Sequence, residues 1–283
     1  MKNYALIGHP LGHSLSPQIH TRLMELAGVG GGYEKLDIPP EELESRFPEL
    51  EKLDGFNITI PHKVAIIPYC GRLDASAARF GSVNCVKNGI EKVGYNTDVF
   101  GFTRSIDMLG ASLGSHVLVI GCGGVGRMMA AEAAYSGGDV TIAVLSDFLI
   151  DAEKTISSIK SRLPRARIRT AVIKGEVLSA EDFGKSVPGF DLLINASPVG
   201  MFPKSDKMPC TEEILAHTNY VFDAVYNPKE TLLAKTARSL GKKAMTGMAM
   251  LVLQAAAAQE IWQGCKFDES DLKTLISDME ALI

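Results

Sequence analysis

Short apolar runs alternate with amphipathic stretches along the whole chain, as strands and helices do when they follow one another. Three runs in the first hundred residues predict strands: 3–8, 33–38 and 55–61. Amphipathic helices are expected between them, and Ser16, Pro17 and Gly28 suit the cap, first turn and end of the first helix. A hairpin is expected over 82–96, because Asn88-Gly89 is a strong turn signal.

From residue 102 onward the same alternation becomes more regular. A strand, a glycine turn and a helix are expected over 116–138. Further strands are expected at 139–145, 167–173, 190–198 and 220–228. Such alternation predicts a parallel sheet covered by helices, so the expected fold class is α/β with two domains, 1–101 and 102–245. The helical segment 246–283 follows, and the pattern leaves open whether it packs back on the first domain.

Composition and charge narrow the function. The formal net charge is −4, and no cluster of Lys and Arg suits a nucleic-acid backbone. No apolar run is long enough to cross a bilayer, and the first apolar run is too short for a signal peptide. The five cysteines are scattered without a C-x-x-C pair, so neither a disulfide framework nor a zinc site is indicated. Reduced thiols in a cytoplasmic protein fit best, and no nucleic-acid or membrane partner is expected.

The glycine turn of the second domain has the spacing of a dinucleotide site. Gly121, Gly123 and Gly126 form G-x-G-x-x-G after an apolar strand and before a helix. Such glycines permit a tight turn and bring backbone N–H groups close to a pyrophosphate. The alternative is a turn that binds no ligand, but the strand and helix around it favour the dinucleotide. The expected cofactor-binding residues of this turn are Gly121, Gly123, Gly124, Val125 and Gly126.

The acid after the next strand bears on which dinucleotide binds. Asp147 lies 21 residues after Gly126, near the spacing expected of an acid that hydrogen-bonds the adenosine ribose. A carboxylate there favours NAD, because it repels the 2′-phosphate of NADP. The alternative is that Asp147 caps the following helix, which is a common role for aspartate.

Four polar residues of the first domain are candidates for chemistry. Lys63 follows a strand that ends in proline, so it stands at a strand end beside a loop. Ser14 and Ser16 lie two apart in an extended segment, point the same way and can together hold a carboxylate. Asp98 ends the sequence GYNTD. Each residue also has a simpler explanation when taken singly. The lysine can be a solvated surface residue, one serine can cap the helix while the other has no role, and the aspartate can belong to a turn.

Three histidines near the N-terminus, His9, His13 and His20, suggest a metal site. Pro10 and Gly12 break the helix that the His9/His13 spacing needs, and no acid or thiol stands nearby in the sequence. No metal is therefore expected.

Eight motifs in one order resemble the shikimate dehydrogenase family. They are GHPLGHSLSPQIH, FNITIPHK, SVNC, GYNTD, GCGGVGR, INASPVGM, YNP and GMAMLVLQAA, and they span nearly the whole chain. The resemblance implies an N-terminal α/β substrate domain, a Rossmann-type cofactor domain, and C-terminal helices that return to the first domain. It also implies the reversible reduction of 3-dehydroshikimate to shikimate, in aromatic amino-acid biosynthesis.

The same resemblance implies roles for single residues. Lys63 matches the family's catalytic lysine, and Asp98 matches its partner aspartate, which also binds substrate. The other implied substrate ligands are Ser14 and Ser16 for the carboxylate, Thr59, Asn84 and Gln254 for hydroxyls, and Tyr226 near the carboxylate. Asn57 is a weaker candidate. Gly247 and the backbone near Ala224 are implied to lie by the nicotinamide.

Carbonyl reduction suits these residue types. Hydride addition to a ketone develops an alkoxide, which needs a proton and a positive neighbour, and a lysine ammonium supplies both. An adjacent carboxylate can orient the ammonium and bind a substrate hydroxyl. Gln254 falls on an apolar helical stripe, where an amide needs either a backbone partner or a substrate hydroxyl. Gln259 falls on the opposite face and is expected to be solvated.

Two features of the sequence bear on cofactor and substrate choice within the family. Ser146, Asp147 and Phe148 stand where NADP-dependent members carry Asn-Arg-Thr, so NAD is expected to be preferred over NADP. Ser16 stands where quinate-preferring members often carry threonine, which favours shikimate. Two alternatives remain: an NAD-dependent quinate/shikimate dehydrogenase with a catabolic role, and a non-catalytic nucleotide-sensing regulator. An intact proton-transfer pair argues against the regulator. A monomer or a homodimer is expected.

Overall fold

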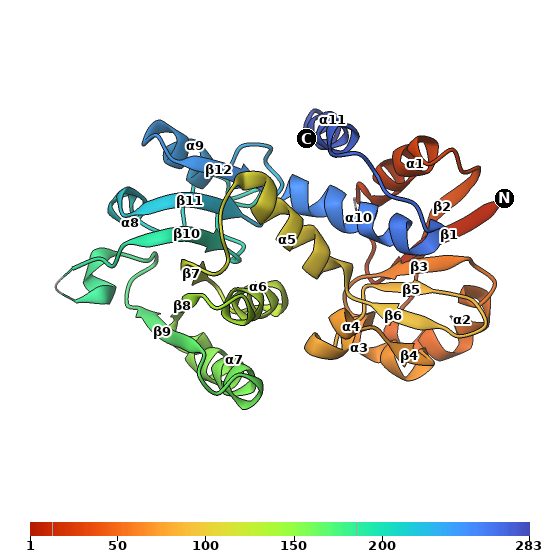
Figure 1. The fold of residues 1–283 in the computed structure, drawn as a ribbon, viewed down its shortest axis with the longest axis horizontal. Helices are drawn as coiled ribbons and strands as arrows, with labels where there is room; N and C mark the ends of the chain where they lie inside the picture. The colour runs from red at the N-terminus through yellow and green to blue at the C-terminus, as the bar shows by residue number, and fades with distance from the viewer. Residues whose placement is uncertain (13, 185) are drawn as a thin grey trace. The chain divides into compact units, whose positions relative to one another are not determined.

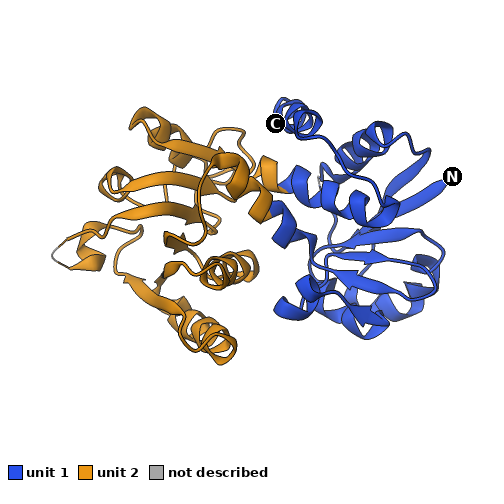
Figure 2. Cartoon of the chain, in the orientation of Figure 1, with its two compact units in different colours: residues 1–101, 251–282 blue, residues 102–250, 283 orange. Residues whose placement is uncertain are grey.

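The structure is a computed structural model that describes residues 1–12, 14–184 and 186–283 (Figure 1). The chain divides into two compact units (Figure 2). The first unit holds residues 1–101 and 251–282, and the second holds residues 102–250 and Ile283. Two helices begin in one unit and end in the other: α5 (Thr97–Leu109) and α10 (Met248–Gln263).

A six-stranded mixed sheet forms the centre of the first unit. In spatial order its strands are β2 (Gly31–Asp37), β1 (Lys2–Gly8), β3 (Gly55–Ile58), β5 (Cys85–Lys87), β6 (Val93–Tyr95) and β4 (Arg72–Leu73). Strand β1 is parallel to both its neighbours, whereas β5 is antiparallel to β3 and β6. The other helices of this unit are α1 (Ser16–Leu26), α2 (Leu43–Leu50), α3 (His62–Ala65), α4 (Ala75–Phe80) and α11 (Glu269–Glu280), with 3₁₀ turns η1 (Pro40–Glu42) and η2 (Ile67–Tyr69).

An all-parallel sheet forms the centre of the second unit. In spatial order its strands are β12 (Lys243–Thr246), β11 (Thr218–Asp223), β10 (Phe190–Asn195), β7 (His116–Ile120), β8 (Asp139–Leu145) and β9 (Arg167–Ile173). Its helices are α6 (Gly124–Tyr135), α7 (Leu149–Arg162), α8 (Glu212–Ala216) and α9 (Leu232–Ser239), with 3₁₀ turns η3 (Ser146–Phe148) and η4 (Ala180–Phe183). The strand order reverses between β7 and β10, and ligands of such sheets bind at the carboxyl ends of the strands beside that reversal.

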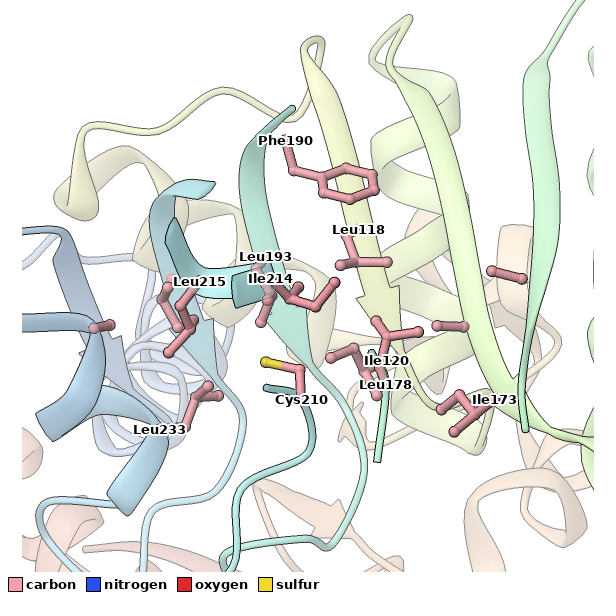
Figure 3. Packing of buried hydrophobic residues seen from close by; sticks show 14 residues of the cluster. Leu118, Ile120, Ile173, Leu178, Phe190, Leu193, Cys210, Ile214, Leu215 and Leu233 are labelled. Carbon is pink, nitrogen blue, oxygen red and sulfur yellow. The ribbon is translucent and has the colours of Figure 1, made fainter. Parts of the chain in front are cut away.

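The strands of the parallel sheet read as continuous apolar runs because helices cover the sheet. Leu118 of β7 and Leu193 of β10 are fully buried, and they pack with Ile214 of α8 and Leu233 of α9 in one cluster (Figure 3). This core leaves little freedom in the strands, so the loops at their carboxyl ends start from fixed positions.

The C-terminal end of α10 packs on the mixed sheet of the first unit. The Trp262 ring stacks on Tyr4 of β1 at 4.4 Å between centroids, and its Nε1 donates to the carbonyl of Val86 at 2.9 Å. Lys87 Nζ donates in turn to the carbonyl of Ile261 at 2.7 Å. These contacts anchor the helix that carries Gln254. No described helix is long and apolar enough to cross a bilayer.

The predicted α/β class with a parallel sheet is confirmed, and so is the hairpin, which is formed by β5 and β6. Two local predictions are wrong. Ser16 does not cap α1, because the helix already begins at Ser16 and its N-cap is Leu15, without a side-chain hydrogen bond. The third strand ends at Ile58 rather than at Pro61, so Lys63 lies in the one-turn helix α3 that follows.

Candidate active site

Lys63 and Asp98 form a short ion pair. Lys63 Nζ lies 2.7 Å from Asp98 Oδ2, with side chains 27% and 19% exposed. The turn that carries Lys63 is anchored by its neighbour His62, which is buried and whose Nε2 lies 2.6 Å from the carbonyl oxygen of Ile38. Lys63 is therefore a held, partly buried ammonium with a carboxylate partner 35 residues away in the sequence, and not a freely solvated lysine.

Asn84 fixes the orientation of the Asp98 carboxylate. The Asn84 Oδ1 atom accepts from the backbone N–H of Thr97 at 2.6 Å, which can only donate, so the amide orientation is settled. Nδ2 must then face Asp98, to whose Oδ1 it donates at 2.9 Å. The two carboxylate oxygens thus each accept one bond, from Asn84 and from Lys63. Among the described contacts Asn84 retains one Nδ2 hydrogen, so it can offer a ligand only a donor.

Thr97 is a further member of this site that the sequence did not single out. Its side chain is fully buried at the start of α5, and its hydroxyl lies 3.1 Å from Asn84 Oδ1 and 3.3 Å from Gln254 Oε1. Gln254 Nε2 donates to the carbonyl of Leu251 at 2.9 Å. The amide of Gln254 therefore has the backbone partner considered above as the alternative, and its second N–H remains for a ligand. The GYNTD motif contained the signal, but threonine before an acid more often indicates a turn.

Asn57 is held by a similar pair of bonds. Its Nδ2 donates to the carbonyl of Asn84 at 3.1 Å, so its Oδ1 must be the atom that accepts from the Tyr33 hydroxyl at 2.9 Å. Asn57 is 4% exposed. Thr59 follows directly after β3, and its backbone N–H donates to the carbonyl of Ile7. The substrate-ligand candidates Thr59 and Asn84 thus stand at the ends of neighbouring strands.

Ser14 and Ser16 lie side by side, although the segment is not extended as expected: Leu15 between them has helical dihedral angles and α1 begins at Ser16. The Ser14 hydroxyl donates to Ser16 Oγ at 3.2 Å, and Ser14 Oγ accepts from the Ser16 backbone N–H at 3.2 Å. With Ser16 Oγ as acceptor in this pair, its own proton can point to a ligand. The loop before the serines is tied to β2 by Asp37, which accepts from the backbone N–H of Leu11 at 2.8 Å and contacts His9 Nδ1 at 2.6 Å.

Two of the three N-terminal histidines have protein partners in the described structure. His9 pairs with Asp37, and His13 lies outside the described residues. His20 is buried against Tyr33, with ring centroids 4.0 Å apart, and burial lowers its pKa to about 3. Among the residues that the structure describes, no three His, Cys, Asp or Glu side chains cluster in a way that could hold a metal ion.

The prediction that Gln259 is solvated is wrong. Its side chain is fully buried, its Nε2 lies 2.9 Å from His20 Nδ1, and its Oε1 accepts from Gln263. The prediction assumed that α10 has one exposed face, as amphipathic helices do. This helix is instead covered on several sides, so position on the helical wheel does not separate buried from exposed residues.

The glycine turn has the geometry that a pyrophosphate needs. Gly121 has a φ of +100°, which side-chain-bearing residues rarely adopt, and a Cβ on Gly126 would meet the Gly121 carbonyl oxygen at 2.5 Å. Helix α6 begins at Gly124 without a side-chain cap. Gly123, Gly124 and Val125 are exposed, so the first backbone N–H groups of α6 are accessible to an anion.

The other cofactor candidates lie at the carboxyl ends of β8, β11 and β12. Asp147 is exposed in η3 directly after β8, with Ser146 Oγ 3.4 Å from its carboxylate. Gly247 follows β12, and its backbone N–H donates to the carbonyl of Val225 at 3.0 Å. A Cβ on Gly247 would collide with the carbonyl oxygen of Ala224, so only glycine permits this approach. Tyr226 lies two residues after Ala224, in the segment that follows β11, and is 37% exposed.

The described contacts therefore unite some of the predicted residues and not others. Asp98 contacts both Lys63 and Asn84. Thr97 connects Asn84 to Gln254, and the two serines contact each other. Tyr226, the glycine turn, Asp147, Ala224 and Gly247 belong to the second unit.

Several known proteins are similar to this chain over nearly its whole length. Residues 6–86 match the family model described as the shikimate dehydrogenase substrate binding domain. A shikimate dehydrogenase (NADP(+)) of Caldanaerobacter subterraneus subsp. tengcongensis is 37% identical, over 95% of this chain and 94% of that protein. A shikimate dehydrogenase (NADP(+)) of Bacillus subtilis is 31% identical, over 97% of this chain and 96% of that protein. The crystal structure of shikimate 5-dehydrogenase from Thermus thermophilus in complex with NADP(H) and shikimate superposes with a TM-score of 0.82, at 29% identity, and covers 98% of this chain and 99% of that one.

These relatives overturn the preference for NAD that Asp147 suggested. Both curated relatives are named for NADP(+), and the Thermus structure holds NADP(H). The prediction gave one carboxylate too much weight. Asp147 is exposed on a short 3₁₀ turn, where water screens its charge and the side chain can turn away from a phosphate.

Proposed function

The chain belongs to the shikimate dehydrogenase family, and we propose that it catalyses the reversible, NADP-dependent reduction of 3-dehydroshikimate to shikimate. The observation that carries this proposal is the Lys63–Asp98 ion pair, flanked by Asn84, because it supplies the proton-transfer group that carbonyl reduction requires.

Lys63 acts as the proton donor in the reduction. Bound NADPH supplies the hydride to the carbonyl carbon, and the electron pair of the C=O bond moves to oxygen. The Lys63 ammonium, 2.7 Å from Asp98, stabilises that developing negative charge and transfers a proton from Nζ to the oxygen. The O–H bond forms as the N–H bond breaks, and the neutral amine regains a proton from solvent. In the oxidation of shikimate the neutral amine accepts the hydroxyl proton.

The remaining polar residues of the first unit hold the substrate. Ser14 and Ser16 present adjacent hydroxyls suited to the substrate carboxylate. Asn84 and Gln254 each keep an N–H for a ring hydroxyl, and Asp98 accepts from one. Thr59 adds a hydroxyl at the end of β3, and Tyr226 is proposed near the carboxylate.

The second unit holds the cofactor. The pyrophosphate is proposed to lie at the N-terminus of α6, on the turn formed by Gly121, Gly123, Gly124, Val125 and Gly126. The nicotinamide is proposed to lie by Gly247 and the backbone of Ala224, as the family resemblance implies, at a place where Gly247 packs against the Ala224 carbonyl. We accordingly propose a substrate domain of residues 1–101 and 246–283 and a cofactor domain of residues 102–245. A cytoplasmic monomer or homodimer is proposed, and five free cysteines are compatible with a reducing compartment.

The purified protein assayed with shikimate and with quinate, each against NADP and NAD, tests this function. We expect the highest kcat/KM with shikimate and NADP. Faster oxidation of quinate than of shikimate would show that quinate is the preferred substrate. Cofactor binding without turnover of any substrate would favour the nucleotide-sensing regulator instead.

A further inference from the structure

A buried carboxylate at the carboxyl end of β11 has no role in the chemistry above. Asp223 is fully buried, and its charge is met by three neutral donors. Its Oδ1 accepts from Asn195 Nδ2 at 2.9 Å and from the backbone N–H of Val225 at 3.1 Å, and its Oδ2 accepts from the Thr231 hydroxyl at 2.6 Å. Burying a charge in this way is costly unless the bonds are well formed, so the geometry around Asp223 is under strong constraint.

The groups around Asp223 form a closed network that joins three loops. Asn195 Nδ2 also donates to the Val199 carbonyl, and Asn195 Oδ1 accepts from both the backbone N–H and the hydroxyl of Ser197. All the hydrogen-bonding capacity of the Asn195 amide is therefore used. Thr231, which donates to Asp223, caps α9 by accepting from the backbone N–H of Ala234. The carboxylate thus connects the loop after β10, the segment after β11 and the start of α9.

The segment that this network fixes most directly is Ala224–Val225. The Ala224 N–H donates to the carbonyl of Asn195 at 2.9 Å, the Val225 N–H donates to Asp223, and the Val225 carbonyl accepts from Gly247 at 3.0 Å. Val225 is therefore held at both its N–H and its carbonyl, and Ala224 is held at its N–H. This segment stands at the carboxyl edge of the parallel sheet, which is the edge where ligands bind.

We propose that Asp223 is a positioning residue for the cofactor, because its carboxylate sets the backbone of Ala224 and Val225 against which the nicotinamide lies. This inference rests on the proposed function for the identity of the ligand. Burial raises the pKa of Asp223 to about 6, against the opposing effect of its three donors, which agrees with a carboxyl group held for its geometry at a cost.

The chain offers a matched control at the other edge of the same sheet. Asp191, on β10, also accepts from a backbone N–H, that of His116 at 3.1 Å, and from an asparagine amide, that of Asn219 at 3.2 Å. It stands at the amino ends of the strands, where no ligand is proposed. Asp223→Ala removes every acceptor from the network, Asp223→Asn keeps one oxygen for Asn195 and Val225, and Asp191→Ala removes the same kind of contact from the opposite edge.

The experiment measures NADPH affinity by fluorescence titration, together with KM for NADP, KM for shikimate, kcat and melting temperature. Asp223→Ala is expected to weaken NADPH binding about tenfold while KM for shikimate changes by less than about twofold. Asp223→Asn is expected to recover most of the affinity, and Asp191→Ala to bind NADPH like the wild type. A folded Asp223→Ala protein with wild-type NADPH affinity overturns the proposal. An equal rise in KM for NADP and KM for shikimate, together with a lower melting temperature, also overturns it, because it indicates a general loss of stability.

If Asp223→Ala does not fold, a second pair of variants tests the proposal instead. Thr231→Val removes the donor from Asp223 Oδ2, and Thr231→Ser retains it. Thr231→Val is expected to weaken NADPH binding about fivefold, with wild-type affinity in Thr231→Ser, and equal affinities in the two variants overturn the proposal. If the proposed function is wrong, the wild-type protein will not oxidise shikimate. The NADPH titration of the variants still tests whether Asp223 affects cofactor binding in that case.

Discussion

The candidate substrate ligands of the first unit and the network around Asp223 in the second unit use their hydrogen-bonding capacity in opposite ways. In the first unit, Asn84, Gln254 and Ser16 each make the bonds that fix their orientation and keep one donor for a ligand, among the contacts described. In the second unit, Asn195 uses its whole amide within the protein, and Asp223 accepts from three groups. The side that we propose binds the substrate is thus built from side chains with remaining hydrogen-bonding capacity, whereas the side that we propose binds the cofactor is built from backbone that side chains hold in place.

This difference predicts different consequences of mutation. A change on the substrate side removes a contact with the reacting molecule, so its effect appears mainly in kcat/KM for shikimate. A change on the cofactor side moves backbone, so its effect appears in cofactor affinity. The following experiments examine that contrast in order of expected effect.

Removing the Lys63 ammonium is expected to have the largest effect on turnover. Lys63→Ala should lower kcat about a thousandfold, because general-acid catalysis and charge stabilisation are both lost, while NADPH affinity remains near that of the wild type. Lys92→Ala is the control, since Lys92 forms an ion pair of 2.5 Å with Glu51 and has a similar exposure in the same unit. An Lys63→Ala enzyme with more than a tenth of wild-type kcat would exclude Lys63 as the proton donor.

Acid is expected to destabilise the first unit through His20. Burial lowers the pKa of His20 from 6.5 to about 3, so this histidine is neutral in the folded state and is protonated below pH 6.5 only when the chain unfolds. Its contribution is fully present above pH 6.5 and is lost as the pH falls toward 3. Between about pH 7 and about pH 5 the free energy of unfolding should fall by about 2 kcal/mol from this residue alone.

The His20→Phe variant tests that assignment by urea unfolding at both pH values. Phenylalanine keeps a ring against Tyr33, and the variant should lose the His20 share of the pH dependence whatever its absolute stability. His116→Gln, which changes an exposed histidine, should keep the full dependence. An unchanged slope in His20→Phe would show that other groups cause the acid effect.

Thr97→Val tests a residue that orients others on the substrate side. Valine fills the volume of the buried threonine but removes the hydroxyl shared between Asn84 and Gln254. We expect about a fivefold lower kcat/KM for shikimate with cofactor KM unchanged, because the backbone N–H of Thr97 still holds Asn84. The control is Thr141→Val, because Thr141 is a buried threonine of β8 in the other unit. It should behave like the wild type in this assay. A larger effect on the KM for NADP than on shikimate would contradict the contrast between the units.

The smallest effect is expected at Asp147. Because this carboxylate is exposed, Asp147→Asn should raise kcat/KM for NADP by no more than about threefold. A gain of tenfold or more would show that the charge strongly opposes the 2′-phosphate and that its exposure does not screen it.

Local and periodic features of the fold could be predicted from the sequence. Apolar runs predicted the parallel sheet, Asn88-Gly89 marked the hairpin, and the glycine spacing marked the turn before α6. Each of these signals lies within a few residues of the structure it specifies. The cap of α1 and the burial of Gln259 were predicted incorrectly, because they depend on where the helix begins and on what packs around α10.

The contacts of the candidate site were less accessible to sequence reasoning. The pairing of Lys63 with Asp98 was expected from the family resemblance alone, since 35 residues and a hairpin separate them. Nothing local indicated that Asp223 meets Asn195 and Thr231, because these partners come from β10 and from the start of α9. The cofactor prediction failed for a related reason: the effect of Asp147 depends on its exposure, which its identity does not reveal.

A double-mutant cycle on kcat for shikimate oxidation, with Lys63→Ala, Asp98→Ala and the two combined, tests the central claim most directly. Residues that act as one proton-transfer unit have strongly non-additive effects, so the double variant should be about as slow as Lys63→Ala alone. If the two losses multiply in the double variant, Lys63 and Asp98 act independently, and the ion pair is not the catalytic unit.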